Sequence, residues 1–286
     1  MLASIRRALT IAGIVLLFVV LVGATYQGVV TALERHQFPH PGRLLTVDDH
    51  QLHIYCRGKG SPTVVLEAPA TAMSSAWGWV QASVERNTRA CSYDRAGLGW
   101  SEMGDAPFIP EAVAEQLHTL LASAGENPPL IMAGADLGAA FARIYASRYP
   151  DDVAALVLVN PPGPFNTRTV PPSVEFLTLS PWLARVGVLR ATRALSSSAA
   201  DLPPTSAGAL RAFLNRPDHL TRAAAEMAHW DGIVAMSDAA TLRRSLPVTQ
   251  VEVEGKDRIA ELSDPRNAQD VASAITRAVI ALRAQK

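Results

Sequence analysis

An aspartate stands at the point of this sequence where the residue types and spacing most strongly suggest chemistry. Residues 134–138 read G-A-D-L-G, so that Asp136 is framed by two glycines. An apolar run at 129–133 precedes this segment, and a helical pattern at 139–146 follows it. A strand, a sharp turn and a helix form the context in which a G-x-S-x-G segment presents a nucleophilic serine. Because Asp136 replaces that serine, Ser-His-Asp chemistry cannot operate here.

The elements that must position Asp136 can be read from the apolar pattern. Short apolar strands alternate with helical segments, which indicates a mostly parallel sheet covered by helices on both faces. A hairpin is expected at its start, from two apolar runs flanking a polar turn. The predicted hairpin strands are 44–47 and 52–56, the buried strands are 63–68, 89–93, 130–133 and 154–159, and an amphipathic helix is predicted at 109–124.

Composition excludes several function classes. The chain has 286 residues, equal numbers of acidic and basic residues, and no visible internal repeat. A net charge of zero provides no electrostatic attraction for nucleic acid, so no nucleic-acid partner is expected. The two cysteines, Cys56 and Cys91, do not form a metal-type pair, and no H-x-x-x-H spacing occurs. We therefore expect no metal and no cofactor.

The N-terminal region predicts a membrane anchor. No charged residue occurs from Ala8 to Leu33, and about 20 apolar residues suffice for a helix to cross a bilayer. Arg6 and Arg7 precede the run and should stay in the cytoplasm, which places the main domain outside it. A cleaved signal peptide ending near residues 22–24 is the alternative. We expect a single-pass anchor in residues 1–38, with the lipid bilayer as its partner, and one domain in residues 39–286.

Several motifs resemble the α/β-hydrolase superfamily, in particular its membrane-anchored bacterial branch. They are C-R-G at 56–58, V-V-L-E-A at 64–68, Y-D-R-A-G-L-G-W-S-E at 93–102, the glycine-framed segment, and Y-P-D-D-V-A-A-L-V-L-V at 149–159. The resemblance implies an α/β-hydrolase fold with a helical lid inserted at about 161–245. Only residues 248–254 remain for the final strands, so one late strand–helix unit should be missing.

The resemblance also implies the roles of site residues. Asp136 occupies the nucleophile position, as in relatives that open epoxides or displace halide through an alkyl ester. The alternative is that Asp136 only caps the following helix. The backbone N–H groups of Ala70 and Leu137 would form the oxyanion hole, although Pro69 stands where the family has glycine.

The family's catalytic histidine has no clear counterpart in this chain. Alignment on Pro265 puts Arg258 at the histidine position and Asp257 at the position of the preceding glycine. A second alignment treats residues 255–257 as the acid loop, which makes Asp257 a possible acid, and the histidine is then absent. Arginine stays protonated and cannot act as a base. The lid histidines, His219 and His229, are expected to serve ordinary packing.

The nucleophile, the histidine and the oxyanion loop all depart from the family's pattern together. The protein is predicted to be a non-hydrolysing member that binds a ligand or partner. An active hydrolase with Asp136 as nucleophile and an unidentified base is the alternative. Asp136 and Arg258 should form an ion pair if the Pro265 alignment holds. The apolar lid segment 174–188 could line a pocket for an apolar small molecule, touch the bilayer, or simply pack on the core.

The resemblance further predicts a disulfide. The family's strand order places the second strand beside the fourth, with Cys56 on one and Cys91 on the other. Facing residues on neighbouring strands lie close to the reach of a disulfide. The alternative is two reduced thiols, because a slip of one residue in register would put the cysteines on opposite faces.

Overall fold

The computed structural model describes residues 2–104, 107–163, 174–195 and 199–285. Its centre is a seven-stranded sheet in the order β1-β2-β4-β3-β5-β6-β7. The first three strands in this order pair antiparallel and the remaining pairs are parallel. The strands are β1 (Arg43–Val47), β2 (His50–Arg57), β3 (Thr63–Glu67), β4 (Ala90–Tyr93), β5 (Leu130–Ala135), β6 (Val153–Val159) and β7 (Val248–Val251). The predicted mostly parallel sheet and its opening hairpin are therefore confirmed.

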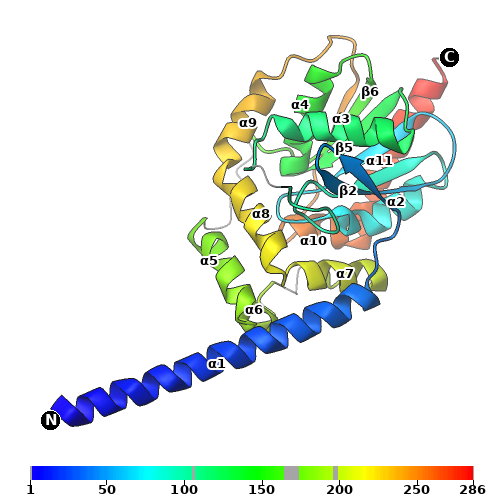
Figure 1. The fold of residues 1–286 in the computed structure, drawn as a ribbon. Coiled ribbons are helices and arrows are strands. Elements are labelled where there is room, and N and C mark those ends of the chain that lie inside the picture. The colour runs from blue at the N-terminus through cyan, green and yellow to red at the C-terminus, as the bar shows by residue number, and fades with distance from the viewer. Residues whose placement is uncertain (1, 105–106, 164–173, 196–198, 286) are drawn as a thin grey trace.

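Helices cover both faces of the sheet (Figure 1). One face carries α3 (Ala112–Ala124) and α4 (Leu137–Arg148), and the other carries α2 (Gly78–Val84), α10 (Arg258–Ser263) and α11 (Pro265–Arg283). After β7 the described chain forms only α10 and α11, in agreement with the expected loss of a late strand–helix unit. The fold class predicted from the sequence is thus the one observed.

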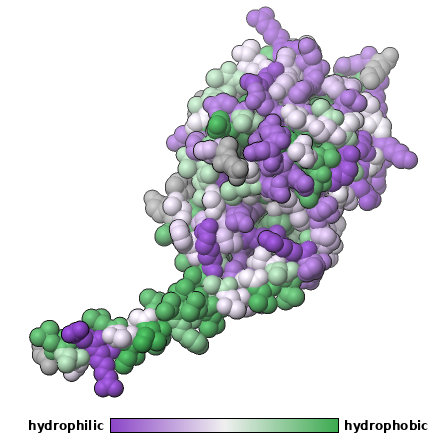
Figure 2. Space-filling view, viewed as in Figure 1, coloured by the Kyte–Doolittle hydropathy of each residue, from purple (hydrophilic) through white to green (hydrophobic). Residues whose placement is uncertain are grey.

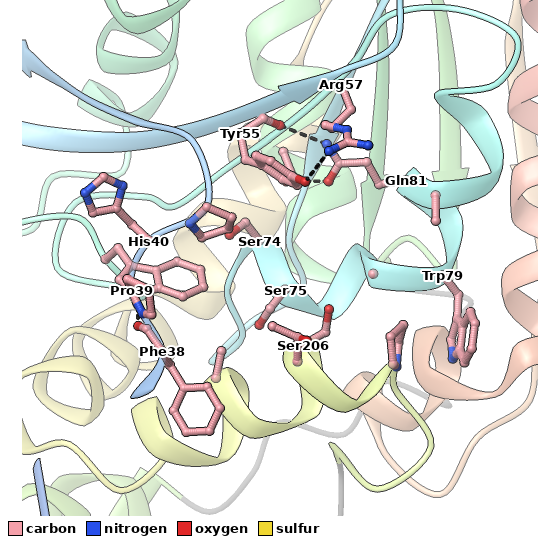
Figure 3. A pocket seen from close by; sticks show the side chains of 18 of the residues that line it. Phe38, Pro39, His40, Tyr55, Arg57, Ser74, Ser75, Trp79, Gln81 and Ser206 are labelled. Atoms are coloured by element: carbon pink, nitrogen blue, oxygen red, sulfur yellow. Dashed lines mark hydrogen bonds between the residues drawn. The ribbon is translucent and has the colours of Figure 1, made fainter. Parts of the chain in front are cut away.

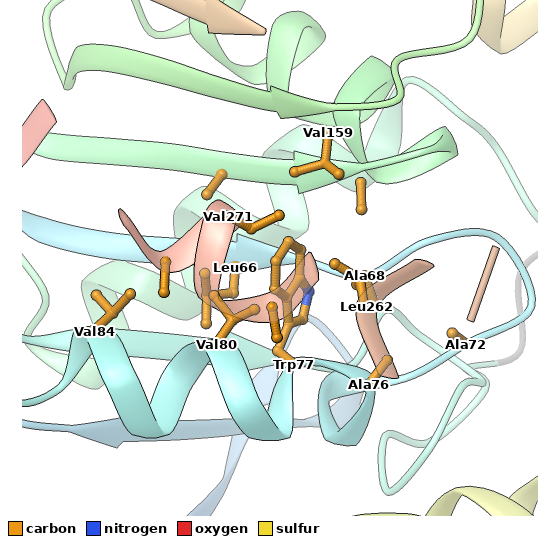
Figure 4. Close-up of a cluster of buried hydrophobic side chains, with 14 of the residues drawn as sticks. Leu66, Ala68, Ala72, Ala76, Trp77, Val80, Val84, Val159, Leu262 and Val271 are labelled. Atoms are coloured by element: carbon orange, nitrogen blue, oxygen red, sulfur yellow. The ribbon is translucent and has the colours of Figure 1, made fainter. Parts of the chain in front are cut away.

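Side chains that alternate in direction along the buried strands contribute to a hydrophobic core on each face of the sheet. In β3, Val64 and Leu66 point to one face and Val65 to the other, as the period of two in a strand requires. Figure 4 shows Trp77 and Val80 packing between the sheet and α11. Burial on both faces explains why these strands read as continuous apolar runs.

The segment between β6 and β7 is mostly helical and occupies the predicted lid position. Its described helices are α5 (Val174–Arg185), α6 (Val188–Thr192), α7 (Pro204–Phe213), α8 (Pro217–Ala228) and α9 (Trp230–Ala239). Leu177 is buried with Met227 and Trp230, whereas Leu179 and Trp182 are exposed. The apolar segment 174–188 therefore packs on the core along one side only.

The predicted disulfide joins β2 to β4. Cys56 lies directly opposite Cys91 in the antiparallel pair, with 4.0 Å between their Cα atoms and the two sulfurs bonded. The register that the sequence left open thus brings both side chains to the same face of the sheet. Their nearness to Glu126 does not make a metal site, because each sulfur is bonded to the other.

A long apolar helix, α1 (Leu2–Gln37), precedes the sheet. Its N-terminal half projects from the body and is hydrophobic (Figures 1 and 2). It is long and apolar enough to cross a membrane, and none of its most apolar stretch is buried. Its C-terminal part packs on the body: the Gln27 side chain is buried and donates to the Asn215 carbonyl at 2.7 Å. The helix therefore runs without a break from its projecting half to the part that packs against the lid.

Candidate functional site

The turn between β5 and α4 has the strained geometry of a nucleophile elbow. Asp136 has φ 51° and ψ −124°, a backbone conformation that is costly for any residue with a side chain. Gly138 is required because a Cβ there would collide with the backbone oxygens of Glu67 and Ala68. The chain thus keeps the strained turn although the residue at its apex is an aspartate.

The Asp136 carboxylate is fully buried, and it contacts both Arg258 and the backbone N–H of Ala70. Its Oδ2 is 2.9 Å from Nε of Arg258, so the predicted ion pair is present. The backbone N–H of Ala70, one expected oxyanion donor, donates to the same oxygen at 3.3 Å. Leu137, the other expected donor, is the first residue of α4. Asp136 therefore places its own negative charge beside a group expected to bind an oxyanion.

Arg258 reaches Asp136 from the start of α10. Its guanidinium lies over the ring of Trp230, with its Cζ 4.8 Å from the ring centroid. Asp257 caps the same helix by accepting from the backbone N–H groups of Ile259 and Ala260 at 3.1 and 2.8 Å. The contact between Arg258 and Asp136 favours the alignment on Pro265. It also places Asp257, the candidate acid, at a helix N-terminus.

Glu261, one turn after Arg258, was not identified from the sequence. Burial raises the pKa of Glu261 to about 7, a hydrogen bond from Asn160 opposes the shift, and the nearby Asp136 charge adds to it. Burial also raises the pKa of Asp136, against the opposing effect of Arg258. The spacing of three residues on one helix face could have indicated that Glu261 accompanies Arg258. Two acids and one guanidinium therefore lie together at the elbow.

No histidine takes the catalytic position. All seven histidines lie in the described part of the chain, and none of them forms a hydrogen bond or ion pair with Asp136. His219 is buried, where its Nδ1 accepts from the Gly99 N–H and its Nε2 donates to the Thr71 carbonyl, both at 3.0 Å. Burial lowers the pKa of His219, which favours the neutral ring. His53 is buried against Asp94 at 2.9 Å.

A second buried charge cluster ties the lid to the sheet. Arg95 contacts Glu67 at 2.6 Å and binds Glu226 of α8 through two nitrogens, at 2.8 and 2.9 Å. The Tyr93 hydroxyl also donates to Glu67. All four side chains are buried. A carboxylate and a guanidinium in such a bidentate arrangement fix orientation as well as distance, so α8 is held on the core.

A cavity of about 530 Å³ lies apart from the elbow, at the C-terminal end of α1. Figure 3 shows Phe38 and His40 on one side, Arg57 and Tyr55 on another, and Trp79 opposite Phe38. Its lining combines aromatic and aliphatic side chains with a similar number of polar or charged ones, among them Arg57 and Glu85. Further lining residues are Pro39, Ser75, Ala82, Trp100, Pro203 and Ala209. Such a cavity suits a small, mostly apolar ligand.

Sequence comparison identifies the family. A family model described as the alpha/beta hydrolase fold matches residues 70–231. An uncharacterized protein of Schizosaccharomyces pombe is 25% identical over 185 residues, which are 52% of this chain and 34% of that protein. The chain covers 34% to 46% of the length of the first curated relatives it matches, from S. pombe and Bacillus subtilis. Relatives therefore occur in yeast as well as in bacteria.

Solved structures share the fold. An esterase from Thermogutta terrifontis has a TM-score of 0.58 and 17% identity, and the match covers 83% of this chain and 100% of the esterase. The Cif epoxide hydrolase from Acinetobacter nosocomialis has a TM-score of 0.67 and 12% identity, with coverage of 90% and 96%. At these identities the likeness concerns the fold alone.

Proposed function

This chain belongs to the alpha/beta hydrolase fold family, and we propose that it is a non-hydrolysing, membrane-anchored member that binds an apolar ligand. One observation carries the first part: the Asp136 carboxylate is paired with Arg258 at 2.9 Å and accepts from the Ala70 N–H. Acyl transfer needs a nucleophile, a base and a vacant oxyanion site. Here an anion lies beside an oxyanion donor, and a permanent cation stands in the base position.

Turnover assays test this proposal directly. We expect the purified protein to hydrolyse p-nitrophenyl acetate, p-nitrophenyl butyrate and styrene oxide no faster than Asp136→Ala does. The Asp136→Asn variant serves as the matched control, since it keeps the size of the side chain and removes its charge. Turnover by the wild type that both substitutions abolish would overturn the proposal.

Glu261 gives specific support to the alternative, a hydrolase that uses Asp136 as nucleophile. Its pKa of about 7 suits a general base, and the Oδ1 of Asp136 has no hydrogen-bond partner among the described residues. In that reaction an Asp136 oxygen would attack an epoxide carbon, the C–O bond would break, and the ring oxygen would take the proton of neutral Glu261. The Glu261 carboxylate would then take a proton from the water that attacks the ester carbonyl, which releases the diol and restores the Asp136 carboxylate. Single turnover in ¹⁸O-water would leave the label in Asp136, which mass spectrometry of its peptide detects.

The ligand part of the proposal rests on the cavity of about 530 Å³ beside Phe38. Its aromatic wall residues Phe38, Trp79 and Trp100 and its place directly after the apolar helix suit a molecule supplied by a membrane. The probe for this test is a fluorescent fatty acid. We expect Ala82→Trp, at the exposed rim, to weaken binding, because indole would fill the mouth. The exposed Ala281→Trp on α11 is the control and should bind normally; equal binding by both variants would count against this site.

We also propose that the protein belongs to the bacterial, membrane-anchored branch, with its N-terminus in the cytoplasm and its domain outside. Its support is the apolar helix, the two arginines before it, and the disulfide, because disulfides persist in oxidising compartments. Protease treatment of intact spheroplasts should digest the domain. Protection of the domain in spheroplasts that become sensitive after lysis would reverse the topology.

A further inference from the structure

The lid carries exposed apolar side chains at one end. Leu179 and Trp182 on α5 are 58% and 67% exposed, and Val188 at the start of α6 is 41% exposed. From Phe176 to Leu189 the only charged residue is Arg185, whose guanidinium lies over the Trp182 ring with its Cζ 4.9 Å from the centroid. This end of the lid, residues 179–188, is called the lid tip below. Its composition is unusual for a face in contact with water.

The lid tip lies against α1 where that helix meets the body. A Cβ at Gly23 would collide with the Val186 carbonyl, so the two backbones touch there. Tyr26, one turn later and 47% exposed, lies beside Gly187. In Figure 1, α5 and α6 are the helices of the body nearest to the projecting half of α1. The lid tip is therefore the first part of the body that a membrane around α1 would meet.

The length of α1 indicates how far the lid tip must enter the bilayer. From Ala8, the first residue after the arginine pair, to Val22, just before the contact with Val186, α1 has about 15 residues and spans about 22 Å at about 1.5 Å per residue. The hydrocarbon core of a bilayer is about 30 Å thick. The free part of α1 is thus too short to cross the hydrocarbon core by itself. The remaining part of the core must be crossed by the next residues of α1, which the lid tip flanks.

We propose that the lid tip is a second membrane-contacting element, in which Leu179, Trp182 and Val188 insert at the boundary between headgroups and acyl chains. The inference rests on the proposed anchoring by α1. Trp182 and Tyr26 are the residue types that favour this boundary. Arg185 beside Trp182 can reach lipid phosphate while its stem stays in the apolar layer. The lid tip is then held at a constant depth in the bilayer.

Fluorescent labels on single introduced cysteines test this insertion. Both native cysteines are in the disulfide, so labelling without reductant reaches only the new thiol. The full chain is reconstituted in phosphatidylcholine and phosphatidylglycerol vesicles containing two bromolipids, one brominated near the headgroup for the lid tip and one brominated deep in the acyl chain for Leu16. The labelled variants are Leu179→Cys and Val188→Cys at the lid tip, Leu16→Cys within α1, and Ile280→Cys on α11. Leu16 and Ile280 are both exposed, as are the lid-tip positions.

We expect blue-shifted emission and bromine quenching at Leu179, Val188 and Leu16, and neither at Ile280. Quenching at Leu16 without quenching at the lid tip would overturn this inference and leave the anchor intact. Loss of quenching at Leu16 as well would overturn the anchor and the inference together. A lid-tip label shielded from both bromolipid and aqueous iodide would mean that a second protein copy covers this face, which also contradicts the proposal.

Discussion

Asp136 and Arg258 are opposite charges in a place where neither is stable alone. The carboxylate is fully buried, and the guanidinium side chain is 15% exposed. Removing one member of such a pair leaves a buried charge without a partner, whereas replacing both with apolar groups leaves no buried charge at all. The pair therefore need not make the fold more stable than a leucine and a methionine would.

The first prediction is a strongly non-additive double-mutant cycle. Arg258→Met should lower the free energy of unfolding by about 3 kcal/mol, whereas Asp136→Leu combined with Arg258→Met should cost much less. Urea denaturation measures all four corners of the cycle. The pair of Arg266 and Asp264 on the surface is the control, and Arg266→Met should change the free energy of unfolding far less than Arg258→Met does. Additive effects at Asp136 and Arg258 would refute their contact.

The second prediction concerns Glu261 and pH. Its pKa is raised from 4.5 to about 7 in the folded protein, so the folded state binds the proton more tightly than the unfolded state. Stability should therefore fall as pH rises from about 4.5 to about 7. Glu261→Gln should raise the free energy of unfolding at pH 8 by about 1 kcal/mol, a value reduced for partial solvent screening. The difference from wild type should vanish near pH 4.5; a difference independent of pH would contradict the shift.

At the scale of elements, β2 depends on β4 for its place in the sheet. These strands pair antiparallel, and the disulfide between Cys56 and Cys91 closes a loop with a sequence separation of 35. A cross-link of that span restricts the unfolded chain, which stabilises the folded state by about 2–4 kcal/mol. The bond therefore secures the antiparallel edge of an otherwise parallel sheet.

The third prediction is that the bond exists in protein taken from its native cells. Alkylation without reductant, followed by mass spectrometry, should find the peptides of Cys56 and Cys91 linked. The double change Cys56→Ala/Cys91→Ala should lower the midpoint of urea unfolding while the wild type under reducing conditions shifts to a similar value. Two alkylated cysteines in the native sample would reject the bond and weaken the case for export.

At the scale of the whole molecule, α1 does two things. Its first part projects from the body, and its last part packs on the lid helices (Figure 1). Arg190 of α6 pairs with Glu34 and donates to the Gln27 side chain at 2.9 Å. Phe38 fills the space beside Gly208 of α7. The part of α1 after Gly23, together with Phe38, thus packs against the body.

The fourth prediction compares two truncations. Deletion of residues 2–22 should leave the melting temperature of the body almost unchanged. Deletion of residues 2–38 should lower it by about 5–10 °C, because losing the buried contacts of Gln27 and Glu34 costs a few kcal/mol. Differential scanning calorimetry in detergent measures both. Equal melting temperatures would show that α1 is independent of the body along its whole length.

The sequence by itself determined whatever depends on neighbours in the chain. Apolar runs predicted the strands, the absence of charge from Ala8 to Leu33 predicted the long helix, and two glycines around Asp136 predicted the strained turn. Asp136 and Arg258 could be paired in advance only through a resemblance, and that left two alignments open. These patterns are readable because periodicity and local backbone requirements act over a few residues.

Only the tertiary structure decided what joins distant segments. It placed Arg258 over Trp230 and brought Glu261 so near Asp136 that the Asp136 charge raises the pKa of Glu261. It also set the register that aligns Cys56 with Cys91 and formed the cavity between the end of α1 and α7. Strand order, register and the path of the lid control these contacts, and a shift of one residue reverses the face of a strand. No local pattern encodes that choice, because it is made by packing whole elements against one another.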